Sequence, residues 1–199
     1  MDMKRCRNPN HPKKGSFIKV EPIRSTRKIQ RIKKILYDNP RNYCLFVLGI
    51  NSAYRASDLL SIRVRNVKHL QPNGELELKE KKTQKNRRVN LNNACIEAIQ
   101  RLLKSRPYND DDYLFLGQRG RLTVSTLSFL VKSWCREENL PGNYASHTLR
   151  KTWGYHQRAT FKTPLPILME AFRHSPQRQT LDYLCVNSEE IKSIYQNEI

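Results

Sequence analysis

The chain has 199 residues, of which 38% are hydrophobic and 28% charged, a balance typical of a globular protein rather than a disordered or fibrous one. Its 37 Lys and Arg outnumber its 18 Asp and Glu, and the resulting net charge of +19 indicates a polyanionic partner such as nucleic acid. The longest apolar run, Cys44–Ile50, is far shorter than the roughly 20 residues of a membrane span, so no membrane protein is expected.

The cysteines indicate reduced thiols in an intracellular protein. The five are widely spaced and include no Cys-x-x-Cys pair, which argues against a disulfide framework and a zinc ribbon. Cys6 and His11 could supply two metal ligands, but no second pair lies near them, so no metal site is predicted. The N-terminus lacks the apolar stretch of a secretory signal.

Residues 1–23 are predicted to form an irregular basic arm. They contain three prolines and one glycine, and their many basic side chains, including Lys13 and Lys14, could lie along a phosphate backbone. A solvated basic face or a ribosome-associated protein would show a similar excess of charge. Charge therefore predicts a class of partner and no chemistry.

Helices are predicted after the arm. Ser25 can cap the first one, whose apolar residues recur at helical spacing: Ile29, Ile32, Ile35 and Leu36. Pro40 suits the first turn of a second helix, which carries the apolar run to Ile50. A turn then leads to a short helix that Ser57 can cap, with Asp58 in its first turn.

Alternating side chains in the middle of the chain predict a β-hairpin. Glu75–Lys79 and Arg88–Leu91 alternate on either side of the polar link Lys82–Asn86, and an earlier strand is expected near Val64–Val67. Helices resume near Asn93 and near Thr123. Shorter helices are predicted over residues 147–160, 164–173, 177–183 and 188–197.

This order predicts an α+β fold that is mostly α, with helices around a small three-stranded antiparallel sheet. The chain shows no βαβ alternation, no Gly-x-Gly-x-x-Gly and no Walker loop, so a nucleotide-binding fold is not expected.

Two clusters late in the chain could carry chemistry. His147 and Arg150 lie three residues apart, so a helix presents both on one face, although such pairs usually lie on solvated surfaces. His174 is followed nine residues later by Tyr183, which taken alone is a packed aromatic near the end of the chain.

Two further features lie upstream. Arg55 precedes a helix whose first turn holds Asp58, which alone would be an ordinary exposed ion pair. Lys82 lies in a turn with other lysines, as many hairpin tips do. The ordered combination of Arg-x-x-Asp, a hairpin lysine, His-x-x-Arg and His-x8-Tyr resembles the tyrosine recombinases of the phage-integrase family. The resemblance runs from about Ser25 to the end of the chain.

The resemblance implies a role for each matched residue. The implied catalytic residues are Arg55, Lys82, His147, Arg150, His174 and Tyr183, with Tyr183 as the nucleophile. Asp58 would brace the site from behind. Lys82 is chosen over its neighbours because Lys82–Arg87 is similar to the Lys-Gly-Asn-Lys-x-Arg hairpin of the family. The expected DNA contacts are Lys13, Lys14, Lys85, Arg87 and Arg173.

The chain departs from the family pattern in two places. Phe172-Arg173-His174 replaces the usual Leu-Gly-His, so Arg173 could crowd the turn or add a phosphate contact. Family members usually carry an N-terminal DNA-binding domain, which we do not expect here, and the short layout resembles the fimbrial phase-variation invertases. The expected organisation is a basic arm (1–23), a catalytic domain (24–187) and a helical tail (188–199), which either docks in trans on a neighbouring protomer or folds back on its own domain.

The implied function is site-specific DNA recombination through a 3′-phosphotyrosyl intermediate, with no metal or other cofactor. The expected partner is double-stranded DNA with a specific target site, bound by a homotetramer of protomers that are monomers in solution. The resemblance places the protein in the cytoplasm or nucleoid of a prokaryotic cell, encoded by a phage or mobile element. The alternatives are a topoisomerase-like nicking-closing enzyme and a catalytically idle DNA-binding regulator with the same fold.

Overall fold

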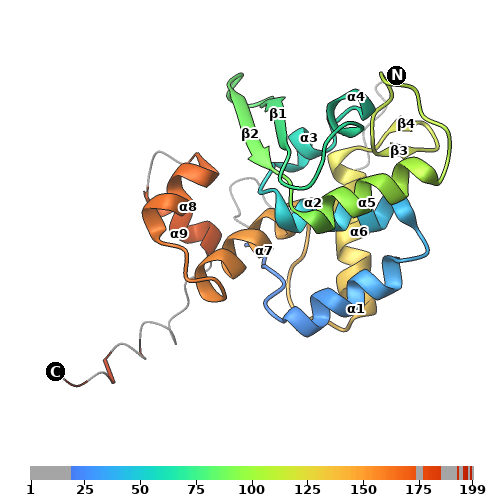
Figure 1. The fold of residues 1–199 in the computed structure, drawn as a ribbon. Helices are drawn as coiled ribbons and strands as arrows, with labels where there is room; N and C mark the ends of the chain where they lie inside the picture. Colours follow the sequence, from blue (N-terminus) through green and yellow to red (C-terminus); the bar gives the residue numbers. More distant parts are fainter. Residues whose placement is uncertain (1–18, 174–176, 185–191, 193–194, 197, 199) are drawn as a thin grey trace, which may run out of the picture.

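The computed structural model describes residues 19–173 and 177–184, together with residues 192, 195, 196 and 198. These residues form a mostly helical α+β fold, which confirms the predicted class (Figure 1). The helices are α1 (Thr26–Leu36), α2 (Pro40–Asn51), α3 (Ala56–Leu59), α4 (Val64–Val67), α5 (Asn93–Lys104), α6 (Val124–Glu137), α7 (Ser146–Ala159), α8 (Leu165–Phe172) and α9 (Gln177–Leu184). The strands are β1 (Glu75–Lys79), β2 (Asn86–Asn90), β3 (Leu116–Gly117) and β4 (Gly120–Arg121).

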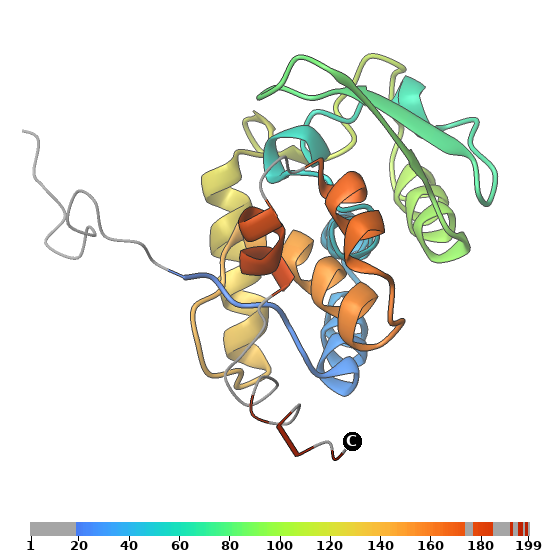
Figure 2. The same cartoon turned by 90° about the vertical axis from the view of Figure 1, so that its left-hand side faces the viewer.

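Helix α2 is the centre of the fold, with α1, α5 and α7 packed on it (Figures 1 and 2). It begins as predicted, with Pro40 in its first turn and the Asn39 side chain accepting from the backbone at 3.1 Å. Its apolar run is buried all round, as a central helix requires. A Cβ on Gly49 would collide with Leu149 of α7. This glycine therefore lets α7 approach α2 closely.

The predicted hairpin is confirmed. Strand β1 pairs antiparallel with β2, Leu76 lies opposite Val89, and Leu76 and Leu78 face the core. Strand β2 begins at Asn86, two residues earlier than predicted. The turn between the strands projects from the body of the molecule beside α8 (Figure 1).

The predicted third strand is wrong. Val64–Val67 forms helix α4, and the β1–β2 sheet has two strands among the described residues. Val64 and Val67 are both buried. Side chains three residues apart share a face in a helix but point to opposite faces of a strand, so the helix is the conformation that buries both. A second short hairpin, β3–β4, was not predicted.

Two predicted boundaries also change. Ser57 does not cap α3: the helix begins at Ala56 behind Arg55, whose carbonyl accepts from the amides of Asp58 and Leu59 at 3.0 and 2.9 Å. The folded domain begins before the predicted residue 24. Ile23 is fully buried, and its amide donates to Thr152 Oγ1 at 2.8 Å.

A small second core holds the C-terminal helices together. Leu168 and Phe172 of α8 pack with Leu184 of α9 and with Ala53, which follows α2. The ring of Phe172 lies 5.2 Å from Trp153 of α7 and 5.4 Å from Tyr183 of α9, measured between centroids. This core fixes α9 on α7. Within the part of the chain described here, no helix combines the length and the apolar character that crossing a membrane requires.

Candidate active site

Tyr183 and His147 meet where α9 packs on α7. The phenolic oxygen of Tyr183 lies 2.9 Å from Nδ1 of His147. His147 is the second residue of α7 and lies at the surface, whereas the ring of Tyr183 is partly buried against the small second core. A hydroxyl beside an imidazole is the arrangement that transfers a proton from a nucleophile to a base.

Arg150 lies one helical turn beyond His147, and its side chain is almost completely buried. Its guanidinium donates to the carbonyl of Ala53 and, at 2.8 Å, to the carbonyl of Phe172. It also lies over the Tyr183 ring, 5.6 Å from the centroid. These contacts fix the guanidinium between α2, α8 and the tyrosine.

Burial and nearby charges change the acidity of this group of residues. Burial, together with the positive charges of Arg87 and Arg55, lowers the pKa of Arg150 to about 9, so the guanidinium stays charged at neutral pH. Burial raises the pKa of Tyr183, and the charges of Arg150 and Arg55 oppose that rise. The phenol is therefore protonated at neutral pH.

The pKa of His147 is lowered, first by loss of hydration and then by nearby positive charges. In decreasing order of effect, these charges are Arg150, Lys151, Arg55 and Lys82. The imidazole is therefore neutral at pH 7, the form that can accept a proton.

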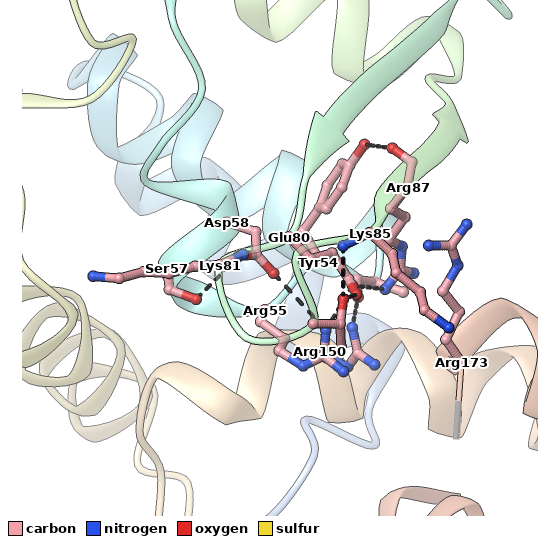
Figure 3. Close-up of polar contacts among 12 residues, drawn as sticks. Tyr54, Arg55, Ser57, Asp58, Glu80, Lys81, Lys85, Arg87, Arg150 and Arg173 are labelled. Carbon is pink, nitrogen blue, oxygen red and sulfur yellow. Dashed lines mark hydrogen bonds and ion pairs between the residues drawn. The ribbon is translucent and has the colours of Figure 1, made fainter. Parts of the chain in front are cut away.

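Arg55 lies in the loop between α2 and α3 and reaches the same site. Its Nη1 lies 2.6 Å from Glu80 Oε1 and 4.0 Å from Asp58 Oδ2 (Figure 3). Asp58 is fully buried, and its Oδ1 accepts from the amide of Lys81 at 3.0 Å. Asp58 therefore contacts both Arg55 and the backbone of the turn that carries the hairpin lysine.

Glu80 is a site residue that the sequence motifs do not predict. It is fully buried at the end of β1, and its Oε1 lies between Arg55 and Arg87, 3.4 Å from Arg87 Nη1 (Figure 3). Arg87 is 4% exposed and donates to the carbonyl of Ala171 at 2.8 Å. Its guanidinium is bound within the protein between Glu80 and Ala171, and the DNA contact of Arg87 stays a prediction.

The remaining predicted residues of the hairpin lie at the surface. Lys82 is exposed in the β1–β2 turn, and its charge acts on His147. Lys85 and Arg173 are exposed beside a hollow of about 710 Å³ between the turn and α8. Arg173 caps α8 in a left-handed conformation, φ 52°, and donates to the Asn86 carbonyl at 2.6 Å. It thereby joins α8 to β2.

Three predicted residues lie outside the described residues: Lys13, Lys14 and His174. Among the residues that the structure does describe, no three His, Cys, Asp or Glu side chains gather as metal ligands would. The positive charge at the site comes from Arg55 and Arg150, with Lys82 and Lys151 nearby. Such a cluster suits an anion such as a phosphodiester.

Comparison with known proteins agrees with the resemblance to tyrosine recombinases. Residues 25–190 match the family model described as "Phage integrase family". The probable integrase/recombinase YoeC of Bacillus subtilis (strain 168) is 33% identical over 182 residues, which cover 88% of this chain and 95% of that protein.

Two further matches are longer proteins. Tyrosine recombinase XerC of Caldanaerobacter subterraneus subsp. tengcongensis is 31% identical over 199 residues, covering 94% of this chain and 54% of that protein. A crystal structure of XerH site-specific recombinase, bound to a palindromic difH substrate after cleavage, superposes with a TM-score of 0.70 at 20% identity. That match covers 87% of this chain and 52% of the solved one, and it shows the fold. The chain thus spans about half the length of these two proteins.

Proposed function

The chain belongs to the phage integrase family of site-specific tyrosine recombinases, and we propose that it cuts and rejoins DNA through a 3′-phosphotyrosyl link to Tyr183. The observation that carries the proposal is the 2.9 Å contact of the Tyr183 hydroxyl with His147, beside the buried guanidinium of Arg150. A nucleophile, a base and a fixed positive charge therefore share one site.

Arg55 and Arg150 would stabilise the reacting phosphate. Negative charge grows on the non-bridging oxygens of a phosphodiester as a nucleophile attacks in line. Guanidinium groups that are already held in place can donate paired hydrogen bonds to those oxygens without reorganising. Here the carbonyls of Ala53 and Phe172 hold Arg150, and the carboxylate of Glu80 holds Arg55.

In the cleavage step, the Tyr183 oxygen forms a bond to phosphorus while the bond from phosphorus to the 5′ oxygen breaks. The phenol proton passes to the neutral His147, and Lys82 gives a proton to the departing 5′ oxygen. His174 would donate to the phosphate. Rejoining reverses these transfers with a new 5′ hydroxyl. Because one phosphodiester is exchanged for another, the net reaction needs no ATP, and we assign no cofactor to it.

The proposed substrate is double-stranded DNA carrying a specific target site. The net charge of +19 and the exposed Lys82, Lys85 and Arg173 around the site support a DNA partner. Recombination cuts both strands of two sites, which takes four tyrosines, so we propose that four protomers assemble on two sites and are monomers without DNA. Inversion, excision and integration all use this chemistry.

Two rival functions differ in their products. A nicking-closing topoisomerase would form the same tyrosyl adduct but relax a plasmid with a single site, whereas a DNA-binding regulator would form no adduct. The test uses a nicked suicide duplex, on which the cleaved fragment diffuses away and traps the adduct. An adduct excludes the idle regulator. Recombinant product from two sites, without relaxation of a one-site plasmid, then supports the recombinase.

A further inference from the structure

In the reaction proposed above Glu80 only holds Arg55, but its carboxylate also contacts the hairpin and a second arginine. Its carboxylate is fully buried and binds three side chains. Oε1 lies 2.6 Å from Arg55 Nη1 and 3.4 Å from Arg87 Nη1 (Figure 3). Oε2 accepts from Thr83 Oγ1 at 2.8 Å. A buried carboxylate is costly unless it is paired and hydrogen-bonded, and Glu80 is both.

The charge state of Glu80 follows from these partners. Burial acts to raise the pKa of the carboxyl, but the hydrogen bond from Thr83 and the charges of Arg55 and Arg87 outweigh burial, and the pKa lies below its usual value. Glu80 is therefore ionised at neutral pH. Its negative charge is shared between an arginine that faces the reacting site and one that is buried behind it.

The three partners come from different segments. Arg55 follows α2, Thr83 lies in the β1–β2 turn next to Lys82, and Arg87 donates to the carbonyl of Ala171 in α8. The backbone of Glu80 closes the same turn, since its amide donates to Lys85 and its carbonyl accepts from Gln84 at 2.9 Å. One carboxylate thus fixes both Arg55 and the turn that carries Lys82.

Asp58 cannot replace Glu80 in this position. Its Oδ1 binds the Lys81 amide and the Ser57 hydroxyl, and its Oδ2 is 4.0 Å from Arg55. Asp58 therefore holds the start of the turn through the backbone. Contact with Thr83, the residue that follows Lys82, comes from Glu80.

We propose that Glu80 is a positioning residue that couples Arg55, at the reacting phosphate, to the turn that delivers Lys82 to the 5′ oxygen. The proposal rests on the function proposed above. Through Thr83, Glu80 positions the turn that carries Lys82, and through its ion pair with Arg55 it positions a guanidinium at the phosphate. Removing the Thr83 contact should impair only proton delivery by Lys82, whereas removing Glu80 should impair both proton delivery and stabilisation of the phosphate by Arg55.

The experiment compares two suicide duplexes, one with the natural 5′-oxygen leaving group and one with a 5′-thiol leaving group. A thiolate leaves without a proton donor, so the thiol duplex does not need Lys82. The variants are Glu80→Gln, which removes the charge and keeps the shape, and Thr83→Ala at an exposed position. Thr83→Ala removes the hydroxyl that donates to Glu80, its 3.4 Å contact with the Lys85 amide, and the methyl group. Thr83→Ser restores the donor. Thr126→Ala, an exposed threonine on α6, is the matched control.

Thr83→Ala is expected to cleave the oxygen duplex about tenfold or more slowly, a fraction of what a general acid contributes, and the thiol duplex at the wild-type rate. Thr83→Ser should recover most of the loss, and Thr126→Ala should match wild type. Glu80→Gln should be slow on both duplexes and slower on the oxygen duplex, because Arg55 is also released. Should Glu80→Gln fail to fold, Thr83→Ala still decides the question.

An equal loss on both duplexes for Thr83→Ala would mean a merely structural contact and would overturn the proposal, as would wild-type rates on both. The function itself is judged by the wild-type protein. An adduct from wild type together with normal Thr83→Ala kinetics rejects only the coupling. No adduct from wild type on either duplex rejects the recombinase reaction and the coupling together.

Discussion

The hydroxyl of Tyr183 lies 2.9 Å from Nδ1 of His147, although 36 residues separate the two in the chain. The contact depends on the small core in which Phe172 and Leu184 pack α8 and α9 against α7. The Tyr183 ring belongs to that packing, whereas its hydroxyl points to the histidine. Ring and hydroxyl can therefore be tested separately.

Tyr183→Phe keeps the ring and removes the hydroxyl. We expect this variant to form no covalent adduct on a nicked suicide duplex and to bind DNA within a few-fold of wild type, because only the hydroxyl reacts. Denaturing gels report the adduct, and gel shifts report binding. A persistent adduct would assign the nucleophile to another tyrosine, and Tyr195, which is 82% exposed, would be tested first.

The pH dependence of cleavage should reflect the lowered pKa of His147. Neutral His147 accepts the phenol proton, so the cleavage rate is at its maximum well above that pKa and falls as the pH drops through it. Because the pKa lies below the ordinary histidine value of about 6.5, the rate at pH 6.5 should exceed half of its plateau value. Single-turnover adduct formation between about pH 5 and pH 8 measures this.

His147→Gln supplies the control for this pH profile. The variant keeps a polar side chain but cannot take up a proton, so its slower cleavage should not show the acidic decline. A wild-type midpoint at or above pH 6.5 would contradict the lowered pKa. An acidic decline that persists in His147→Gln would assign it to another group.

Lys82→Ala should slow cleavage of an ordinary duplex by about 100-fold or more, as expected for loss of a general acid. A duplex with a 5′-thiol leaving group should restore the rate. Lys85→Ala, in the same turn, is the matched control and should weaken DNA binding more than it slows bound complexes. If the thiol fails to rescue Lys82→Ala while Lys85→Ala is rescued, the acid is Lys85.

The fold class and the ordering of helices were predictable because they follow from periodic apolar residues and from residues that begin helices, such as Ser25 and Pro40. Errors occurred where a short segment satisfies two patterns. The buried pair Val64 and Val67 suits one helical turn, but β-branched residues also favour strands. The three-residue spacing is the signal that favours the helix, because it puts both valines on one helical face.

The site could be predicted only as far as its motif residues. Glu80 lies among lysines in a sequence that suggests a solvated hairpin, and Arg87 has the same character. Arg87 is buried where it meets α8 and donates to Ala171 across 84 positions, and Glu80 is buried beside Arg87 and Arg55. A contact between residues so distant in sequence leaves no local pattern. The carboxylate that joins Arg55 to the hairpin therefore becomes visible only in the folded chain.

Removing residues 1–18 should weaken binding to all DNA sequences alike. These residues contain five Lys and Arg, including Lys13 and Lys14, and lie outside the described residues. Each lost phosphate contact should reduce the log–log dependence of affinity on salt by roughly 0.9. Ile23 stays in place, so the melting temperature should hardly change. An unchanged salt slope would show that the arm does not touch DNA.

The last prediction concerns residues 188–199, most of which lie outside the described residues. Ser188 can cap a short helix with Glu189 and Glu190 in its first turn, and Ile191, Ile194 and Tyr195 recur at helical spacing. An apolar stripe of this kind needs a surface to cover it, and in this protomer Tyr195 is 82% exposed. We expect that surface to belong to a neighbouring protomer on DNA, so that assembly and catalysis are coupled through the tail.

Truncation after Asn187 keeps α9 with Tyr183 and Leu184, and should leave a folded monomer that binds one site. It should fail to pair two sites or exchange strands, as sedimentation and a two-site recombination assay would show. Ile191→Asp with Ile194→Asp keeps the length of the tail and removes its stripe, so it should share the defect. If the tail instead folds back on its own domain, truncation will lower the melting temperature of the monomer. Recombination at the normal rate by the truncated protein would refute docking in trans.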